Sequence, residues 1–334
     1  MQSVELILAG FGNVGKAFYE LVRFRRMRIL DRYGLDLFFR AVIRKKGWIC
    51  SPDELGKGIQ PSTRWDEMTG RECFFPPKKS GVWVECTPSD IHTGEPGRTN
   101  ILRALDLGWH VVTAAKGPLV ADPAALYKKA ESRKRKIRIS GATAAALPAI
   151  DTAIYALAGT EIQRIEGILN GTSNYILTRM HQGLIYEEAL REARKKGIAE
   201  PDPSMDVDGW DTAVKLLLIS NAALKQKLCL KDVFVEGIRG LSREELYRQS
   251  KKRKAVKLLG TYLAEKGRIL LSVKPEALDG DHPLYGVVGA EKGITFHTDT
   301  MSRITVTGGK SDPGGAAAAL LKDIINMYKH CIIT

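Results

Sequence analysis

The sequence predicts an α/β protein with a doubly wound parallel sheet in its first half and a second α/β domain after it. An apolar run at residues 4–8 leads into a glycine turn and then into a segment, 16–30, with helical spacing of apolar residues. Strand-like and helix-like segments alternate from there to residue 139, which is typical of parallel sheets. The small-residue segment SGATAAALP, 140–148, marks a change of domain. We therefore expect domains at 1–139 and 140–313, with a helix at about 314–334 packing back on the first.

The glycine turn has the spacing GxGxxG and lies between a predicted strand and a predicted helix. Glycines permit a tight turn and a close approach of a pyrophosphate, to which the helix N-terminus presents free N–H groups. The alternative is a glycine turn that only packs a helix on a sheet. We favour a Rossmann-type dinucleotide site, with these contacts: Gly10, Phe11, Gly12, Asn13, Val14 and Gly15.

The second predicted strand, 37–43, bears on the choice of cofactor. An acidic residue at its end would bind the ribose 2′-hydroxyl of NAD, but the chain continues Arg44-Lys45-Lys46. Because cations suit a 2′-phosphate, we favour NADP, with Arg44 and Lys45 as its contacts. An exposed basic turn explains these residues nearly as well, so NAD stays an alternative.

The remaining strands predicted in the first half place two polar residues at the carboxyl edge of the sheet. Residues 47–80 are polar and rich in turns, and the further predicted strands are 82–86, 110–113 and 137–139, with helices at 97–107 and 123–135. Thr87 and Lys116 follow two of these strands, so we expect both near the nicotinamide, at the carboxyl edge of the sheet. Lys116 taken alone is equally well explained as an exposed loop lysine.

Length, charge and cysteine content limit the class of protein. The 334 residues suffice for two domains, and the net charge of +13 falls in short runs that lack the aromatic pattern of a nucleic-acid module. An anionic cofactor or substrate explains that charge as well, and we expect no nucleic-acid partner. No apolar run has the length of a membrane span, and the start of the chain lacks the basic segment of a signal peptide. Five scattered cysteines without a CxxC pair argue against disulfides and zinc, so we expect a reducing cytoplasm.

The acidic segment GIAEPDPSMDVDGWDTAVK, 197–215, is the most informative stretch of the second half. Two prolines favour an extended backbone in its first part. Asp208 or Gly209 can then begin a helix on which Asp211 and Lys215, spaced i, i+4, share one face.

Three readings of this segment compete. It can be a solvated acidic loop with a surface ion pair. It can be a calcium loop, but Lys215 would stand where an EF-hand needs its last glutamate, which argues strongly against that reading. It can also be a pocket for a small amino acid, in which carboxylates hold the ammonium group and a lysine donates a proton.

The remaining predicted elements fill in the second domain. Thr172 or Ser173 can cap a helix that runs to about residue 182, and Gly197 ends the helix 186–196. Further helices are predicted at 147–157, 248–262 and 314–328, and strands at 163–169, 231–237, 267–273, 285–288 and 294–297.

Four motifs in order resemble the homoserine dehydrogenase family, in its short form without a regulatory domain. They are GFGNVG, TAAKGPL at 113–119, GILNGTSNYIL at 167–177 and GIAEPDPSMDVDGWDTAVKLLLI at 197–219. The resemblance implies NAD(P)-dependent interconversion of L-homoserine and L-aspartate 4-semialdehyde, on the route to threonine and methionine. It also implies a catalytic and dimerisation domain after the nucleotide domain, a homodimer, and no appended regulatory domain.

The resemblance also implies roles for single residues. Lys215 looks like the catalytic proton donor, and Lys116 resembles the family lysine near nicotinamide and substrate. An ammonium group at either position can stabilise the negative oxygen formed at C4. The other positions that match the family are the carboxylates Asp211, Glu200 and Asp206 and the loop residues Gly171 and Thr172 on the substrate side, and Gly197 on the cofactor side.

The sequence departs from the family pattern at several places. Ser140 stands where the family often has glutamate near a sodium site, which puts sodium at the Thr143 backbone in doubt. Ile198 and Met205 replace residues that are commonly tyrosine and an acid, so a dehydrogenase of another small amino or hydroxy acid stays an alternative. A dinucleotide-binding sensor without catalysis is the alternative of a different class. The family's glycine turn near the C-terminus is altered at 308–315.

Overall fold

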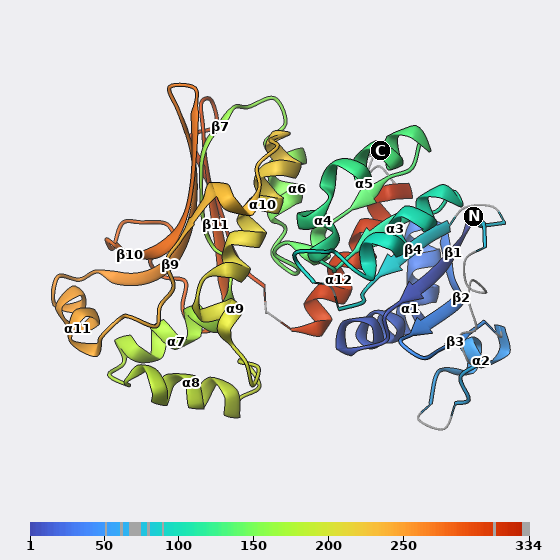
Figure 1. Cartoon of the computed structure of the whole chain (residues 1–334), viewed down its shortest axis with the longest axis horizontal. Helices are drawn as coiled ribbons and strands as arrows, with labels where there is room; N and C mark the ends of the chain where they lie inside the picture. Colours follow the sequence, from blue (N-terminus) through green and yellow to red (C-terminus); the bar gives the residue numbers. More distant parts are fainter. Residues whose placement is uncertain are drawn as a thin grey trace. The chain divides into compact units, whose positions relative to one another are not determined.

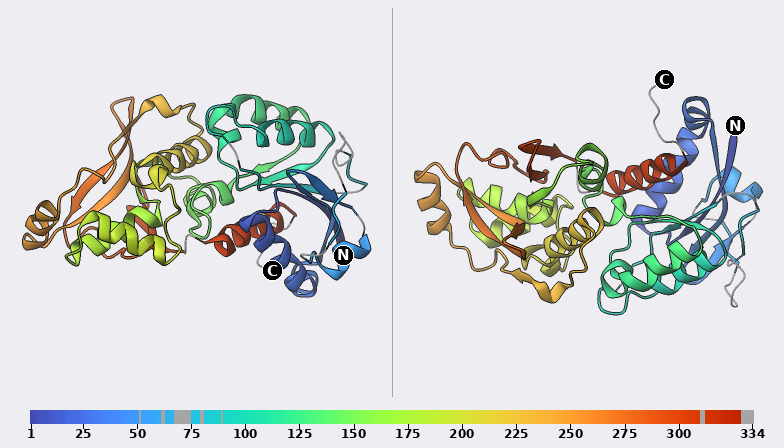
Figure 2. Two further views of the ribbon diagram at one scale, coloured as in Figure 1. Left: turned by 60° about the horizontal axis from the view of Figure 1, so that its bottom comes forward. Right: turned by 90° about the horizontal axis from the view of Figure 1, so that it is seen from above.

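The computed structural model describes residues 1–50, 52–60, 63–66, 75–78, 81–88, 90–309 and 312–328 (Figure 1). The chain divides into two compact units. The first is Met1–Ala145 with Pro313–Thr334, and the second is Ala146–Asp312. Each unit contains one six-stranded sheet with helices packed on it, as two further views show (Figure 2). The predicted α/β class is confirmed.

The first sheet has the strand order β3-β2-β1-β4-β5-β6. All its pairings are parallel except β2 with β3, which form a hairpin. The order runs outward from β1 in both directions, so the sheet is doubly wound and changes direction between β1 and β4. The strands are β1 Gln2–Ala9, β2 Leu35–Arg44, β3 Gly47–Ile49, β4 Gly81–Glu85, β5 His110–Thr113 and β6 Ile137–Arg138.

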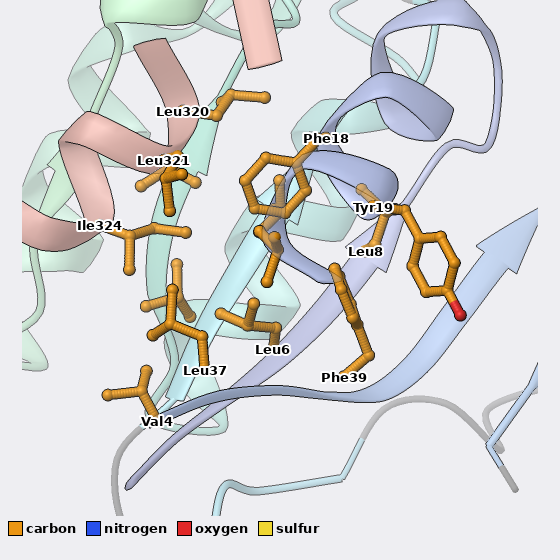
Figure 3. Packing of buried hydrophobic residues seen from close by; sticks show 14 of the residues in the cluster. Val4, Leu6, Leu8, Phe18, Tyr19, Leu37, Phe39, Leu320, Leu321 and Ile324 are labelled. Carbon is orange, nitrogen blue, oxygen red and sulfur yellow. The ribbon is translucent and has the colours of Figure 1, made fainter. Parts of the chain in front are cut away.

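Helices α1 and α12 cover one face of this sheet. Phe18 and Tyr19 of α1 and Leu320 and Ile324 of α12 point onto the strand side chains around Leu6 (Figure 3). The alanines at 316, 317 and 319 are buried, and their small side chains allow α12 to lie close to its neighbours. The described helices of the unit are α1 Asn13–Tyr33, α2 Pro52–Lys57, α3 Gly97–Asp106, α4 Gly117–Ala121, α5 Pro123–Ser132 and α12 Pro313–Tyr328, with a 3-10 turn at Ser140–Ala142.

The second sheet has the order β12-β11-β7-β9-β10-β8 and is antiparallel except where β8 pairs with β10. Its strands are β7 Ile162–Ile168, β8 Val233–Val235, β9 Ala255–Glu265, β10 Arg268–Leu278, β11 Lys292–Thr298 and β12 Arg303–Gly308. The helices of the unit are α6 Ala149–Asp151, α7 Gly171–His181, α8 Tyr186–Lys195, α9 Ser204–Val207, α10 Trp210–Leu224 and α11 Arg243–Lys251, with a π-helical turn at Thr152–Ala156 and a 3-10 turn at Leu230–Asp232.

Several expectations for single elements were wrong. The helix predicted at 248–262 ends at Lys251, and β9 follows, because its eleven residues pair along their whole length with β10. The hairpin turn between them has Lys266 and Gly267 at positive φ. Residues 285–288 form turns and no strand, and the helix predicted at 147–157 is interrupted by the π-helical turn. Strands β3 and β12 were not predicted.

Candidate active site

The turn after β1 has the geometry that a dinucleotide requires. Gly10 has a φ of 94°, and a Cβ there would lie 2.4 Å from the backbone carbon of Cys86. A Cβ on Gly15 would lie 1.9 Å from the Gly10 carbonyl oxygen, whereas one on Gly12 would meet nothing within 4 Å. Two glycines therefore permit close packing, and Gly12 leaves open space at the N-terminus of α1, where no side chain caps the helix. This arrangement fits a pyrophosphate.

The ends of β4 and β5 lie at the same edge of the sheet as this turn. Lys116 is half-buried after β5, and its carbonyl oxygen accepts a hydrogen bond from Leu119 in the first turn of α4. Thr87 follows β4, and both its backbone N–H and its hydroxyl donate to the buried carboxyl of Glu85. Burial raises the pKa of Glu85, while these donors and those of Trp83 and Asn100 oppose the shift. Thr87 is therefore held in a fixed orientation.

The basic residues at the end of β2 lie beside the glycine turn. The Arg44 guanidinium stacks over the Trp65 ring, 4.1 Å from its centroid, and the Phe11 ring lies 5.5 Å from the same ring. Lys45 belongs to the exposed turn between β2 and β3. Stacking on tryptophan fixes the position of the Arg44 guanidinium.

The candidate site of the second unit is built around Lys215 of α10. Its Nζ donates to the backbone oxygen of Leu169 at 2.8 Å and lies 2.6 Å from Oδ2 of Asp211. The two side chains are only 12% and 8% exposed. This pair is therefore nearly buried, and the explanation as a solvated surface ion pair is wrong.

Asn170 connects this pair to a second carboxylate. Its Nδ2 donates to Asp206 at 2.6 Å and to Asp211 at 2.7 Å. Burial, and next the nearby charge of Asp211, raise the pKa of Asp206, while Asn170 and Lys215 act in the opposite direction. Asn170 also caps α7, because its side-chain oxygen accepts from the Ser173 N–H at 2.8 Å. The expected cap at Thr172 or Ser173 was therefore wrong, and Asn170 is a site residue that the sequence reasoning missed.

The backbone around α9 explains the position of Asp206. The chain after the prolines forms one helical turn where an extended backbone was expected, and Gly209, with a φ of 88°, precedes α10. The Arg239 guanidinium pairs with the Asp208 carboxylate and donates to the Ser204 hydroxyl at 3.1 Å. Asp206 therefore sits on a short helix that is fastened at both of its ends.

The other predicted substrate residues lie around this cluster. Gly171 and Thr172 are buried at the start of α7, and the Thr172 hydroxyl donates to the Ile198 carbonyl at 3.0 Å. Because Ile198 contributes a backbone oxygen here, its departure from tyrosine does not affect this contact. Gly197, with a φ of 68°, follows the end of α8 as expected.

Glu200 and Met205 are placed differently from the buried carboxylates. Both lie at the surface of the second unit, and Met205 is 42% exposed. Neither the Glu200 carboxylate nor the Met205 side chain is part of the hydrogen-bonded cluster of Lys215, Asp211, Asp206 and Asn170. Glu200 therefore stays a predicted ligand without structural support from this cluster.

The surroundings of Ser140 do not fit a sodium ion bound through that side chain. The hydroxyl donates to the Asp323 carboxylate at 2.7 Å and accepts from Lys322 Nζ at 2.9 Å. Its carbonyl oxygen accepts from the Thr143 hydroxyl and the Ala145 N–H. An ammonium group already occupies this polar position. Within the described part of the chain, no group of three or more His, Cys, Asp and Glu side chains could hold a metal ion.

The described residues contain no helix long and apolar enough to cross a membrane. Cys86 and Cys229 have free thiols, and Cys73 and Cys331 lie outside the described residues.

A doubly wound sheet with an open pyrophosphate turn, together with a buried lysine–carboxylate cluster, defines a dinucleotide-dependent oxidoreductase. A family model described as homoserine dehydrogenase matches residues 148–325. The chain is 34% identical to the homoserine dehydrogenase of Methanocaldococcus jannaschii, over 97% of this chain and 98% of that protein. It is 32% identical to the NAD(+)-dependent homoserine dehydrogenase of Pseudomonas canavaninivorans, over 98% and 97%. The crystal structure of a putative homoserine dehydrogenase from Archaeoglobus fulgidus matches with a TM-score of 0.88 and 31% identity, covering 98% of this chain and all of that one.

The chain therefore belongs to the homoserine dehydrogenase family, NAD(P)-dependent oxidoreductases that act on a CH–OH group. The resemblance inferred from the sequence motifs is confirmed. Because the family consists of enzymes of amino-acid biosynthesis, the alternative of a non-catalytic sensor is set aside.

Proposed function

We propose that the protein interconverts L-homoserine and L-aspartate 4-semialdehyde with NAD(P), on the route to threonine and methionine. The observation that carries the proposal is the buried Lys215–Asp211 pair, which Asn170 joins to Asp206. Homoserine has an ammonium group and a reacting oxygen at C4, and this cluster offers a partner for each.

The charge of the cluster favours an ammonium ligand. With both carboxylates ionised, Asp206 and Asp211 carry two negative charges and Lys215 one positive charge, so one negative charge stays uncompensated. Burial and the neighbouring Asp211 raise the pKa of Asp206, and a bound ammonium would stabilise the ionised form. Asp206 is therefore the proposed partner of the substrate amino group, with Asp211 beside it, and with Gly171, Thr172 and Glu200 as further substrate residues.

Lys215 is the proposed proton donor. A lysine ammonium has three N–H groups, and the partners of Lys215 Nζ among the described residues are the Leu169 oxygen and the Asp211 carboxylate. The third N–H can reach a substrate oxygen, stabilise its negative charge and transfer a proton. Bound NAD(P) supplies or accepts the hydride. Asp211 orients the Nζ, and Lys116, at the edge of the nucleotide sheet, is the second candidate donor.

NADP is the proposed preferred cofactor. Arg44 is fixed by Trp65 at the end of the strand that meets the adenine ribose in Rossmann-type sheets, and its guanidinium suits a 2′-phosphate. Lys45 follows it in the turn. The proposed contacts elsewhere are the glycine turn, Thr87, Lys116 and Gly197. The NAD(+)-dependent relative shows that the family contains the other preference as well.

A homodimer is the proposed assembly, in a reducing cytoplasm. One face of the second sheet carries exposed apolar side chains: Leu270 of β10 pairs with Leu263 of β9, and Phe234 of β8 pairs with Ser272 on the same face. Phe234 and Leu270 are 60% and 59% exposed. A second copy of the chain would bury this face. Sedimentation of the wild type and of a Phe234→Glu/Leu270→Glu variant tests this: a monomeric wild type contradicts it.

The function is tested by following NADPH and NADH oxidation with L-aspartate 4-semialdehyde, and the reverse reaction with L-homoserine. We expect turnover in both directions. A protein that binds the cofactor but turns over neither substrate would contradict the proposal. Turnover restricted to another small amino or hydroxy acid would support the alternative raised by Ile198 and Met205.

A further inference from the structure

Asn170 occupies the centre of the candidate site, and its amide group is fully engaged. Both N–H groups of Nδ2 point at carboxylates, to Asp206 at 2.6 Å and to Asp211 at 2.7 Å. The side-chain oxygen accepts from the Ser173 N–H at 2.8 Å and from its hydroxyl at 3.1 Å. The two carboxylates need a donor, which only the NH2 end of the amide supplies, and the Ser173 N–H needs an acceptor, which only the amide oxygen supplies. These contacts therefore determine the orientation of the amide.

The two carboxylates come from different elements. Asp206 lies on the short helix α9 and Asp211 in the first turn of α10, with Gly209 at positive φ between them. Two like charges brought together repel each other. Arg239 fastens α9 through Ser204 and Asp208, and Lys215 pairs with Asp211, but neither contact joins the two carboxylates directly. Asn170 reaches both from the N-terminus of α7, and its two hydrogens set their separation. The other groups that face Asp206 are Thr172 of α7 and Lys215 of α10.

A purely structural explanation is available for Asn170, since it caps α7. That role needs only the side-chain oxygen, and serine, aspartate and asparagine are about equally good caps. It does not need the Nδ2 hydrogens, which are the atoms aimed at the two carboxylates. The two roles therefore respond differently to substitution.

We infer that Asn170 is a positioning residue that holds Asp206 and Asp211 at the separation at which both reach the substrate ammonium group. The inference rests on the proposed function, in which these carboxylates receive that group. Asn170 touches neither hydride nor proton in this assignment. Its loss therefore affects substrate binding more than the chemical step or the cofactor.

The test uses two variants that keep the cap and remove the amide hydrogens. Asn170→Ser keeps an oxygen for the Ser173 N–H, and Asn170→Asp keeps the shape but adds a third carboxylate. We expect the KM for homoserine to rise at least about tenfold in Asn170→Ser, the range for losing hydrogen bonds to charged groups. The KM for NADP should stay at the wild-type value. In Asn170→Asp the homoserine KM should rise further, and its pH profile should change because a third acid titrates in the pocket.

The matched control is Asn221→Ser, which removes an amide of the same kind from α10, where its side chain bonds the Leu228 backbone. It should leave the homoserine KM unchanged. If the wild type turns over homoserine and both Asn170 variants keep its KM, pH profile and melting temperature, Asn170 is only a cap and the inference is wrong. If the wild type shows no turnover, the proposed function itself fails. If Asn170→Ser does not fold, Asn170→Asp carries the same comparison, because aspartate caps as well as asparagine.

Discussion

Replacing Lys215 with methionine removes the only ammonium in the described carboxylate cluster and leaves a side chain of similar length. If Lys215 donates the proton, kcat should fall at least about a hundredfold, the range for loss of an acid–base group. Lys215→Arg is the matched control, because it keeps the charge but rarely gives up a proton. The free energy of unfolding of Lys215→Arg should therefore stay closer to the wild-type value than its kcat does.

The same substitution has a predictable cost in stability. Asp211 is 8% exposed and would lose its cation while keeping the Asn170 hydrogen bond at 2.7 Å. Breaking a buried ion pair costs about 3–5 kcal/mol, and the remaining hydrogen bond places this case near the lower limit. Adding Asp211→Asn removes the uncompensated charge, so the double variant should regain most of that stability.

The assay combines steady-state kinetics with urea unfolding. It compares the wild type, Lys215→Met, Lys215→Arg and the double variant Lys215→Met/Asp211→Asn. We expect the double variant to regain most of its free energy of unfolding but to stay inactive. This separation distinguishes a catalytic lysine from a structural one. An undiminished kcat in Lys215→Met, or recovery of kcat together with stability in the double variant, would refute the assignment.

Four further substitutions test the cofactor preference, the role of Asp206 and the geometry of the glycine turn. Arg44→Ala should lower the ratio of kcat/KM for NADP to that for NAD by about tenfold, since a charge-assisted contact to the 2′-phosphate is lost; an unchanged ratio contradicts the NADP assignment. Because burial raises the pKa of Asp206, the folded protein binds this proton more tightly than the unfolded chain. The free energy of unfolding therefore falls as pH rises from the pKa of Asp206 in the unfolded chain to its pKa in the folded protein. Asp206→Asn should therefore raise the melting temperature at neutral pH, lose this advantage in acid and raise the homoserine KM; an equal melting temperature at all pH values contradicts it. Gly15→Ala should unfold or strongly destabilise the first unit, because the new Cβ would lie 1.9 Å from the Gly10 oxygen. Gly12→Ala should have a free energy of unfolding within about 1 kcal/mol of the wild type but should bind NADP more weakly. Equal stability of the two glycine variants would contradict the geometry of the turn.

The first unit could be predicted well from the sequence because its signals are local. The glycine spacing follows an apolar run directly, and β5 was predicted at its observed bounds, 110–113. The i, i+4 pair of Asp211 and Lys215 is local in the same way, since a helix alone brings the two side chains together. Such features depend on few residues and need no knowledge of distant contacts.

The features that the sequence did not reveal depend on contacts between distant segments. Residues 255–262 have a helical pattern, but pairing with β10 makes them a strand. Asn170 lies 41 residues from Asp211 and 36 from Asp206, so no spacing rule connects them. One feature of the sequence could have identified Asn170 as the cap. Asparagine is a strong N-cap residue, and Asn170 lies two residues before Thr172, the first of the two predicted cap positions.

The most direct test of the account is a crystal structure of the protein with NADP and L-homoserine bound. We predict that the homoserine ammonium lies within hydrogen-bond distance of the Asp206 carboxylate and that the C4 hydroxyl accepts a hydrogen bond from Lys215 Nζ. A homoserine molecule bound away from both side chains, or a Lys215 that contacts only Leu169 and Asp211 in the complex, would contradict it.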